Sequence, residues 1–287
     1  MRADRDAHAG LLRSGDPPPF HARPGRSAGY LIVCDHASAA IPALLGTLGL
    51  SAPQLAAHIA IDLGARWAAL RVAERLNAPA VMAGYSRLVI DCNRYPWDPA
   101  SIAPDSDRTR IPGNLGLSAD ERAARIDAIF LPYHRAIAAA LDELGAREAR
   151  PVFLSIHSCT PQLDGKSRPW HIGLSYHPPD ALARSMLEAL RRNAHLSMGD
   201  NQPYTLDLAV DYTTPEHALR RGLPYLQVEF RQDLIASPAD ARAWADRFVD
   251  ALSSLPQSSL APPPGWTPAW PSPHLGARAA DLLAPAG

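Results

Sequence analysis

Short apolar runs alternate along the chain with longer segments in which apolar side chains recur at helical spacing. Three runs are apolar for most of their length and contain or end in polar residues: 30–36 (YLIVCDH), 151–158 (PVFLSIHS) and 223–231 (LPYLQVEFR). Such runs, rich in β-branched and aromatic residues, are typical of buried strands. Residues 78–94 (APAVMAGYSRLVIDCNR) contain two more runs of this kind, so the pattern predicts two further strands there.

The longer segments have the apolar periodicity of amphipathic helices. They cover residues 53–76, 118–144, 181–193 and 238–255. We expect the first to break near Gly64, because glycine is a poor helix former. Ser118 and Glu121 have the spacing of a capping box, which marks the start of the second helix. The alternation of strands and helices predicts an α/β domain whose sheet is covered by helices on both faces.

The composition supports one large folded domain and argues against two classes of partner. The chain has 287 residues, 47% of them hydrophobic, and a formal net charge of -1, which provides enough apolar material for a buried core. A near-zero net charge argues against a nucleic-acid or membrane-surface partner, since either normally requires a basic face. No apolar run approaches the roughly 20 residues needed to span a bilayer. The N-terminal segment has no apolar secretion core, so we expect a cytoplasmic protein.

Proline-rich flanks border the expected domain. Residues 1–27 are rich in Pro, Gly, Arg and Asp and predict a flexible N-terminal arm. Residues 256–287 predict a Pro-rich C-terminal tail, because proline removes backbone donors and blocks regular structure. We therefore expect a single domain over residues 28–255. Its cysteines have no paired ligand spacing, and we expect them to be reduced, buried thiols.

Three of the predicted strands contain or end in a residue suited to catalysis or metal binding: His36, His157 and Glu229. In α/β sheets, ligands bind outside the carboxyl ends of the strands. A polar residue within an apolar strand is costly unless it has a partner. A hydrogen-bonded core residue is the alternative for each histidine taken alone. Together, two histidines and a carboxylate with an open position suit a catalytic zinc ion, although the same ligands accept other divalent ions.

A series of segments resembles the N-formylglutamate amidohydrolase family, in order and with few gaps between about Tyr30 and Ile235. The segments are CDHASAAIP, HIAIDLGA, SRLVIDCNR, IPGNLGLS, PYHRAI, SIHSCTP, RPWHIGLSYH, GDNQPY, DYTTPEH and VEFRQDL. The resemblance implies a single three-layer α/β/α domain with a mixed central sheet, similar to the zinc carboxypeptidases. It also implies one zinc ion and hydrolysis of a small N-acyl amino acid, above all N-formyl-L-glutamate.

The relation to the carboxypeptidases implies roles for individual residues. His36 corresponds to the first zinc histidine and His157, in SIHS, to the distal one. Glu229 falls where those enzymes carry the general base. The pair Asn93 and Arg94 resembles the pair that grips the terminal carboxylate of a substrate.

The third metal ligand has more than one candidate, because the chain departs from the His-x-x-Glu pattern of the carboxypeptidases. The residue three positions after His36 is Ala39. We favour Asp62, which stands at the centre of HIAIDLG one helical turn after His58. Asp35 is the alternative, but strand alternation would point it away from His36. A third alternative is that Asp62 hydrogen-bonds to a metal ligand and does not itself contact the metal.

Other residues of these segments have less certain roles. Arg87 could stabilise an oxyanion, or form only a structural salt bridge. We expect His171 and Tyr212 to line the substrate pocket, together with Asp211 and His217. Arg231 would share the strand face of Glu229 and bind substrate charge. Lys166 and Arg168 lie in a polar stretch expected at the rim of the site. Two functional hypotheses compete with this one: a zinc hydrolase of another N-acyl amino acid or a small peptide, and a non-catalytic descendant of the family that binds a metal or ligand.

Overall fold

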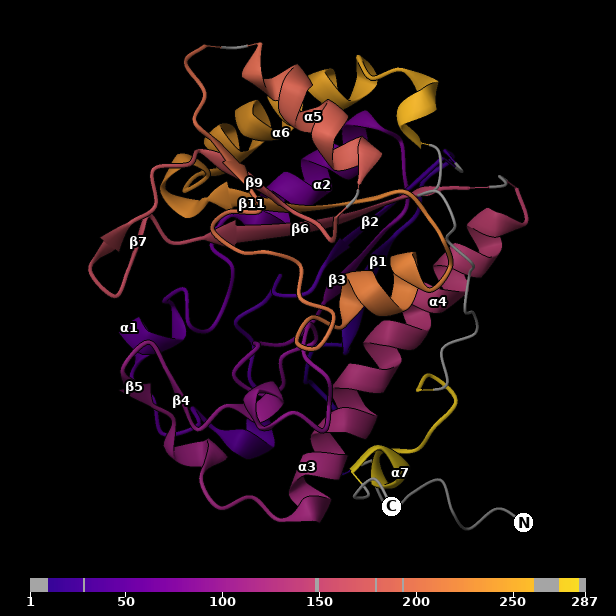
Figure 1. The fold of residues 1–287 in the computed structure, drawn as a ribbon. Coiled ribbons are helices and arrows are strands. Elements are labelled where there is room, and N and C mark those ends of the chain that lie inside the picture. The colour runs from indigo at the N-terminus through magenta and orange to yellow at the C-terminus, as the bar shows by residue number, and fades with distance from the viewer. Residues whose placement is uncertain are drawn as a thin grey trace.

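The protein is described from a computed structural model, which covers residues 10–27, 29–147, 150–178, 180–192, 194–260 and 274–283. Its centre is a seven-stranded sheet with the strand order β1-β3-β2-β6-β11-β9-β10 (Figure 1). The strands are β1 (Phe20–Arg23), β2 (Tyr30–Cys34), β3 (Ala80–Ala83), β6 (Val152–Cys159), β9 (Ile172–Ser175), β10 (Met198–Asp200) and β11 (Tyr225–Arg231). Two small hairpins lie outside the sheet: β4 (Asp105–Ser106) with β5 (Thr109–Arg110), and β7 (Gln162–Leu163) with β8 (Lys166–Ser167).

The four central strands, β3, β2, β6 and β11, run parallel to one another. β1 and β9 are antiparallel to their neighbours β3 and β11, so the sheet is mixed. Because the central strands are parallel, their carboxyl ends meet at one edge of the sheet. The register of β6 and β11 pairs His157 with Glu229, which places these two side chains next to each other.

Helices cover both faces of the sheet. α2 (Ala65–Arg75), α5 (Ala181–Arg191) and α6 (Pro238–Ser253) lie on one face, and α4 (Leu131–Gly145) lies on the other (Figure 1). α3 (Ala119–Arg125) leads into α4 through a π-helical turn, Ile126–Phe130, and contacts the short α7 (Ala279–Leu283). The three-layer α/β/α fold with a mixed central sheet, which the sequence predicted, is confirmed.

Shorter helical pieces connect these elements. They are α1 (Ala52–Leu55), the 3₁₀ turns Ala43–Leu45, Pro99–Ile102, Pro112–Asn114, Gln232–Leu234 and Gln257–Leu260, and the π-helical turn Pro215–Leu219. Within the described ranges, no helix combines the length and the apolar character needed to cross a bilayer. The three cysteines are buried and free, as expected.

The second strand predicted within residues 78–94 is wrong. Residues 87–94 form a buried loop, with only a single bridge between Arg94 and Asp211. Side chains take the place of a neighbouring strand: Asn114 Nδ2 donates to the Leu88 carbonyl at 2.9 Å, and Arg125 Nη1 donates to the Val89 carbonyl at 3.0 Å. The apolar run therefore reflects burial of this segment. Buried strands and buried loops both have such runs.

The expected N-terminal arm also needs a correction. Residues 20–23 form β1 and pair with β3 at the edge of the sheet, so part of the segment belongs to the domain. The short strands β9 and β10 were not predicted either. In the Pro-rich tail, residues 274–283 are described, and Ala279 is buried against the domain.

The segment predicted as one helix over 53–76 is helical only at α1 and α2. The expected break at Gly64 is confirmed: its φ is 80°, and a Cβ there would lie 2.2 Å from the carbonyl oxygen of Ile235. Residues 56–64 form turns, so the expectation that Asp62 lies one helical turn after His58 is wrong. His58 instead lies outside the site, with Nε2 at 3.1 Å from Asp107.

Candidate metal centre

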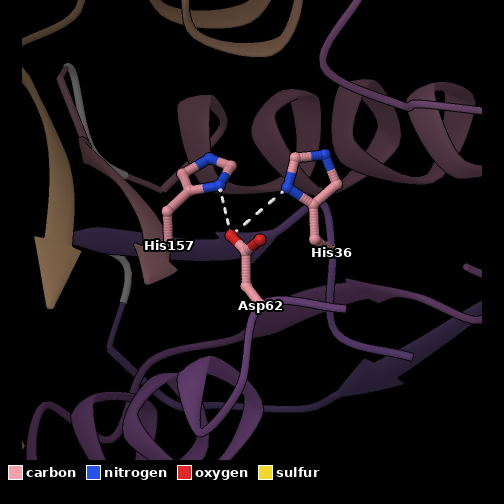
Figure 2. A group of neighbouring side chains, drawn as sticks. All are labelled: His36, Asp62 and His157. Carbon is pink, nitrogen blue, oxygen red and sulfur yellow. Dashed lines mark hydrogen bonds and ion pairs between the residues drawn. The ribbon is translucent and has the colours of Figure 1, made fainter. Parts of the chain in front are cut away.

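His36, Asp62 and His157 converge at the carboxyl edge of the sheet (Figure 2). Asp62 Oδ2 lies 3.2 Å from His36 Nδ1 and 3.0 Å from His157 Nδ1. One ligand atom from each of the three residues lies within 4.8 Å of the others, and all three residues are buried. The structure thus brings together both predicted histidines and the favoured aspartate.

The backbone explains how a residue so far from His36 in sequence reaches it. The Asp62 backbone N–H donates to the His36 carbonyl at 3.1 Å, which ties the segment before α2 to the end of β2. Asp62 Oδ2 also accepts a hydrogen bond from the Ser158 N–H at 3.3 Å. The carboxylate is therefore held between the ends of β2 and β6.

A second set of carboxylates holds the opposite ring nitrogens. His36 Nε2 lies 2.8 Å from Asp91 Oδ1, and His157 Nε2 lies 3.2 Å from Asp35 Oδ2. Asp35 is fixed in turn by Tyr133 and Thr213, whose hydroxyls donate to its Oδ1 at 2.7 and 2.8 Å. Carboxylates in this position orient metal-binding histidines and make them better ligands. Asp35, the alternative ligand, thus contacts His157 on the side away from Asp62.

The charge of this cluster favours a cation. Four buried carboxylates, those of Asp35, Asp62, Asp91 and Glu229, meet one guanidinium, that of Arg87. Burial alone would raise the pKa of Asp62, but the two imidazoles hold it below its ordinary value. Burial likewise opposes the charged form of His157, but contact with carboxylates raises its pKa well above the ordinary value. A divalent ion would displace protons from the imidazoles and offset the remaining negative charge.

The residues therefore fit a metal ion. Two imidazole nitrogens and one carboxylate oxygen form the donor set of many catalytic zinc sites. The ring nitrogens that face away from Asp62 already have carboxylate partners, so the Nδ1 atoms are the ones oriented for coordination.

Glu229 stands beside this ligand set. It is paired in register with His157, is 5% exposed, and its Oε2 is buried without a hydrogen-bond partner among the described residues. Burial raises the pKa of Glu229 to about 7. A buried carboxylate with a pKa near neutrality, beside a candidate metal site, is suited to act as a general base.

The site opens into a cleft of about 220 Å³. Besides His36, Asp62, His157 and Glu229, its lining consists of Arg87, Asn93, Arg94, Ser158, Tyr204, Thr205, Asp207, Val210, Asp211 and Gln227. A cleft of this size accommodates a small molecule with several polar groups.

Arg87 lies within the cluster. Its Nη2 donates to Asp91 at 2.7 Å and its Nη1 to Asp62 at 3.4 Å. Because it both lines the cleft and bonds to two carboxylates of the cluster, the two roles open for Arg87 are compatible.

Asn93 and Arg94 also line the cleft, and Asp211 holds both. Arg94 Nη1 donates to Asp211 at 2.9 Å, and Asn93 Nδ2 donates to the same oxygen at 3.2 Å. Asn93 Oδ1 accepts the N–H groups of Tyr212 and Thr213. The amide of Asn93 is thus largely engaged with the chain and positions the segment around Asp211, while the guanidinium of Arg94 keeps Nε and Nη2 without hydrogen bonds in the described part of the chain.

Four residues expected at the pocket lie outside the lining. His217 is buried, with Nε2 at 3.0 Å from His134 Nδ1. Tyr212 is fully buried, with its ring 4.6 Å from that of His134. His171 Nδ1 accepts the N–H of Ser197 at 3.1 Å, away from the cleft. Arg231 forms two hydrogen bonds with Asp233, at 2.8 and 3.1 Å. Each has a structural contact that accounts for its position, so the expectation that they contact substrate has no support from the cleft.

Sequence reasoning missed two features of the site. Asp91 received no role, although it stands in the same segment as Asn93 and Arg94. The segment was predicted as a strand, and no site residue was sought at Asp91. Tyr204 received none either, although it belongs to GDNQPY. For both residues, membership in a segment that resembles the family was the available signal.

Known proteins resemble this chain over most of its length. The family model of N-formylglutamate amidohydrolases matches residues 28–236. The crystal structure of a gene product from Agrobacterium tumefaciens is 36% identical, with a TM-score of 0.79 over 85% of this chain and 98% of that one. An N-formylglutamate amidohydrolase from Ralstonia eutropha JMP134 is 18% identical, with a TM-score of 0.56 over 82% of this chain and 95% of that one, a likeness of fold. No match was found among curated proteins.

Proposed function

The chain belongs to the N-formylglutamate amidohydrolase family, and from this premise we propose that it hydrolyses the amide bond of an N-acyl amino acid. We take N-formyl-L-glutamate as the substrate, with formate and L-glutamate as products. The observation that carries the proposal is the position of Glu229, a buried carboxylate with a free oxygen beside a three-residue ligand set.

We propose zinc as the ion held by His36, Asp62 and His157. When bound, it supplies a Lewis acid that polarises the scissile carbonyl and makes water a better nucleophile at neutral pH. Asp91 and Asp35 keep the two imidazoles in place through their Nε2 atoms.

Glu229 transfers the protons in this proposal. Its free Oε2 takes a proton from the attacking water and later delivers it to the amine of the leaving amino acid. The burial that raises its pKa to about 7 makes it basic enough for the first step and acidic enough for the second.

Two arginines act on the substrate. Arg87 lies at the cleft next to Asp62 and donates to the oxygen that becomes negative as the carbonyl is attacked. Arg94, which Asp211 holds through Nη1 alone, offers Nε and Nη2 to the α-carboxylate. Together they orient the amide over the ligand set.

Metal analysis and kinetics test the proposal directly. The bound metal of the purified protein is measured, and hydrolysis of N-formyl-L-glutamate is followed by formate release before and after dialysis against a chelator. We expect loss of activity on metal removal and recovery with zinc. Full activity in metal-free protein would refute the zinc mechanism. A panel of N-formyl and N-acetyl amino acids then establishes whether another N-acyl amino acid is the better substrate.

A further inference from the structure

The described part of the C-terminal tail, residues 274–283, packs on the domain. α7 contacts α3 (Figure 1), where Ala279 is fully buried and its N–H donates to Asp127 Oδ1 at 3.2 Å. Arg135 on α4 donates to two backbone carbonyls of the same segment, at 3.2 and 3.3 Å. The segment lies beyond residues 28–236, which match the family model, and it has no role in the mechanism proposed above.

His274, the first residue of this segment, packs on a cluster of aromatic side chains. Its ring centroid lies 4.9 Å from that of Trp97 and 6.5 Å from that of Tyr95. Tyr95 and Trp97 are stacked on each other at 4.9 Å, and Tyr95 meets Tyr212 edge-on at 5.2 Å. The His274 carbonyl accepts the N–H of Ala277 at 3.1 Å, so a turn of the packed segment also fixes the histidine. Ring contacts of this geometry stabilise the arrangement beyond the area that they bury.

Tyr95 connects the aromatic cluster to two segments that line the cleft. Its neighbour in the chain, Arg94, lines the cleft and donates to Asp211 at 2.9 Å. The Tyr95 hydroxyl donates to the Leu208 carbonyl at 3.1 Å, and Leu208 follows Asp207, another residue of the lining. The position of Tyr95 therefore affects both the arginine and the segment that holds it.

The loop over residues 94–98 lies at the surface, where the tail supplies one of its contacts. Trp97 is 43% exposed even though His274 packs on it. A surface loop with few buried contacts opens locally at a low cost in free energy. A substrate that binds only when the loop is in place then binds more weakly, in proportion to the fraction of molecules in which it is. Because the loop is in place in the substrate complex, kcat changes little.

We propose that the packed segment 274–283 holds the loop of Arg94 in place, with His274 as a positioning residue for substrate binding. This inference rests on the proposed function and goes beyond it: binding of the α-carboxylate depends on a part of the chain outside the cleft. His274 acts through Tyr95 and Trp97, and the rest of the segment acts by holding His274 on them.

The test releases the segment from the full-length, zinc-loaded enzyme with a single buried charge. Ala279→Asp places a carboxylate in a fully buried position next to Asp127, so α7 should leave α3. Ala280→Asp adds the same charge at the exposed neighbouring position and is the matched control.

We expect KM for N-formyl-L-glutamate to rise about 10-fold in Ala279→Asp, which corresponds to the loop being in place in about a tenth of the molecules. The value of kcat should stay within about two-fold of wild type, since the bound enzyme is the same. The zinc content should not change. Ala280→Asp should keep the wild-type KM.

Hydrogen exchange provides a readout that needs no substrate. Peptides from 274–283 should exchange faster in Ala279→Asp than in Ala280→Asp, which shows that the segment has left the domain, and peptides covering 91–98 should follow. A released segment with unchanged exchange at 91–98 would overturn the proposal, and so would faster exchange there with an unchanged KM. If wild type hydrolyses no N-acyl amino acid, the proposed function fails, and the exchange comparison still decides whether the segment holds the loop.

His274→Ala covers the case in which Ala279→Asp does not fold, which circular dichroism detects. It removes the ring and leaves α7 packed on α3, so KM should rise in the same direction by a smaller factor. His274→Phe supplies a ring again and should bring KM back toward the wild-type value. An unchanged KM in His274→Ala would overturn the positioning role of this histidine.

Discussion

Replacing Glu229 with glutamine is expected to remove a pH-dependent destabilisation of the metal-free fold and, in the zinc-loaded enzyme, to lower kcat. Burial raises the pKa of this carboxyl from 4.5 to about 7, and the residue is 5% exposed. Above pH 7 the folded protein therefore carries an unfavourable buried charge. Glutamine has nearly the same shape and no charge, so the variant avoids that cost.

The direction in which stability changes with pH follows from proton binding. Between pH 4.5 and 7 the folded protein keeps a proton on Glu229 that the unfolded chain has released, so raising the pH through this window destabilises the fold. The penalty is less than about 1 kcal/mol at pH 5 and grows to roughly 3 kcal/mol at pH 8, at 1.36 kcal/mol per pH unit. Glutamine also leaves a buried amide imperfectly paired, at about 1–3 kcal/mol. That cost does not depend on pH, so the change with pH reports the charge of Glu229 together with that of His157, whose raised pKa depends in part on Glu229.

The assay is urea unfolding of chelator-treated wild type and Glu229→Gln at pH 5 and pH 8. The stability difference should shift in favour of the variant by about 2.5 kcal/mol between the two pH values. In the zinc-loaded enzyme the same substitution should lower kcat by about 10²- to 10⁴-fold while the metal content stays the same. A stability difference that does not change with pH would refute the buried-carboxyl argument. Loss of metal from the variant would make Glu229 a ligand instead of a base.

Three further substitutions test other parts of the structure. Asp91→Asn removes the charge behind His36 and should weaken zinc binding by about 10- to 100-fold in competition with a chromophoric chelator; unchanged affinity would contradict its positioning role. Gly64→Ala should destabilise by more than about 2 kcal/mol in urea unfolding, because φ is 80° and the Cβ meets a carbonyl oxygen at 2.2 Å. Gly116→Ala, with φ of 63° and open space around the Cβ, is its control at about 1 kcal/mol. Arg94→Met should raise KM about 10- to 100-fold for substrates with an α-carboxylate. An equal rise in KM for the corresponding substrate with an α-amide would argue against a contact between Arg94 and the α-carboxylate.

The elements that the sequence predicted well are those whose pattern has one structural explanation. The amphipathic segment over 118–144 forms helix from Ala119 to Gly145, and Ser118 caps it as the capping box requires. The buried strands at 151–158 and 223–231 form β6 and β11. In each case periodicity and flanking residues agree, so local preference and tertiary structure point to the same element.

The failures occur where an apolar run has two explanations. Residues 87–94 are as apolar as a strand, yet Asn114 and Arg125 satisfy their backbone in place of a neighbouring strand. No local pattern distinguishes these cases, because the partners lie elsewhere in the chain. The short strands β9 and β10, four and three residues long, lack the length from which a period can be recognised.

Asp62, the proposed third metal ligand, shows how contacts distant in sequence decide a site. The position three residues after His36 is Ala39, so a ligand on the same turn is not present. Asp62 reaches the site from 26 residues away because its backbone N–H donates to the His36 carbonyl. Gly64 then turns the chain into α2 in a conformation that a side chain would strain. A backbone hydrogen bond and one glycine thus place Asp62, where the carboxypeptidases use a local His-x-x-Glu motif. For this reason the family resemblance and the geometry indicate Asp62, and the spacing from His36 does not.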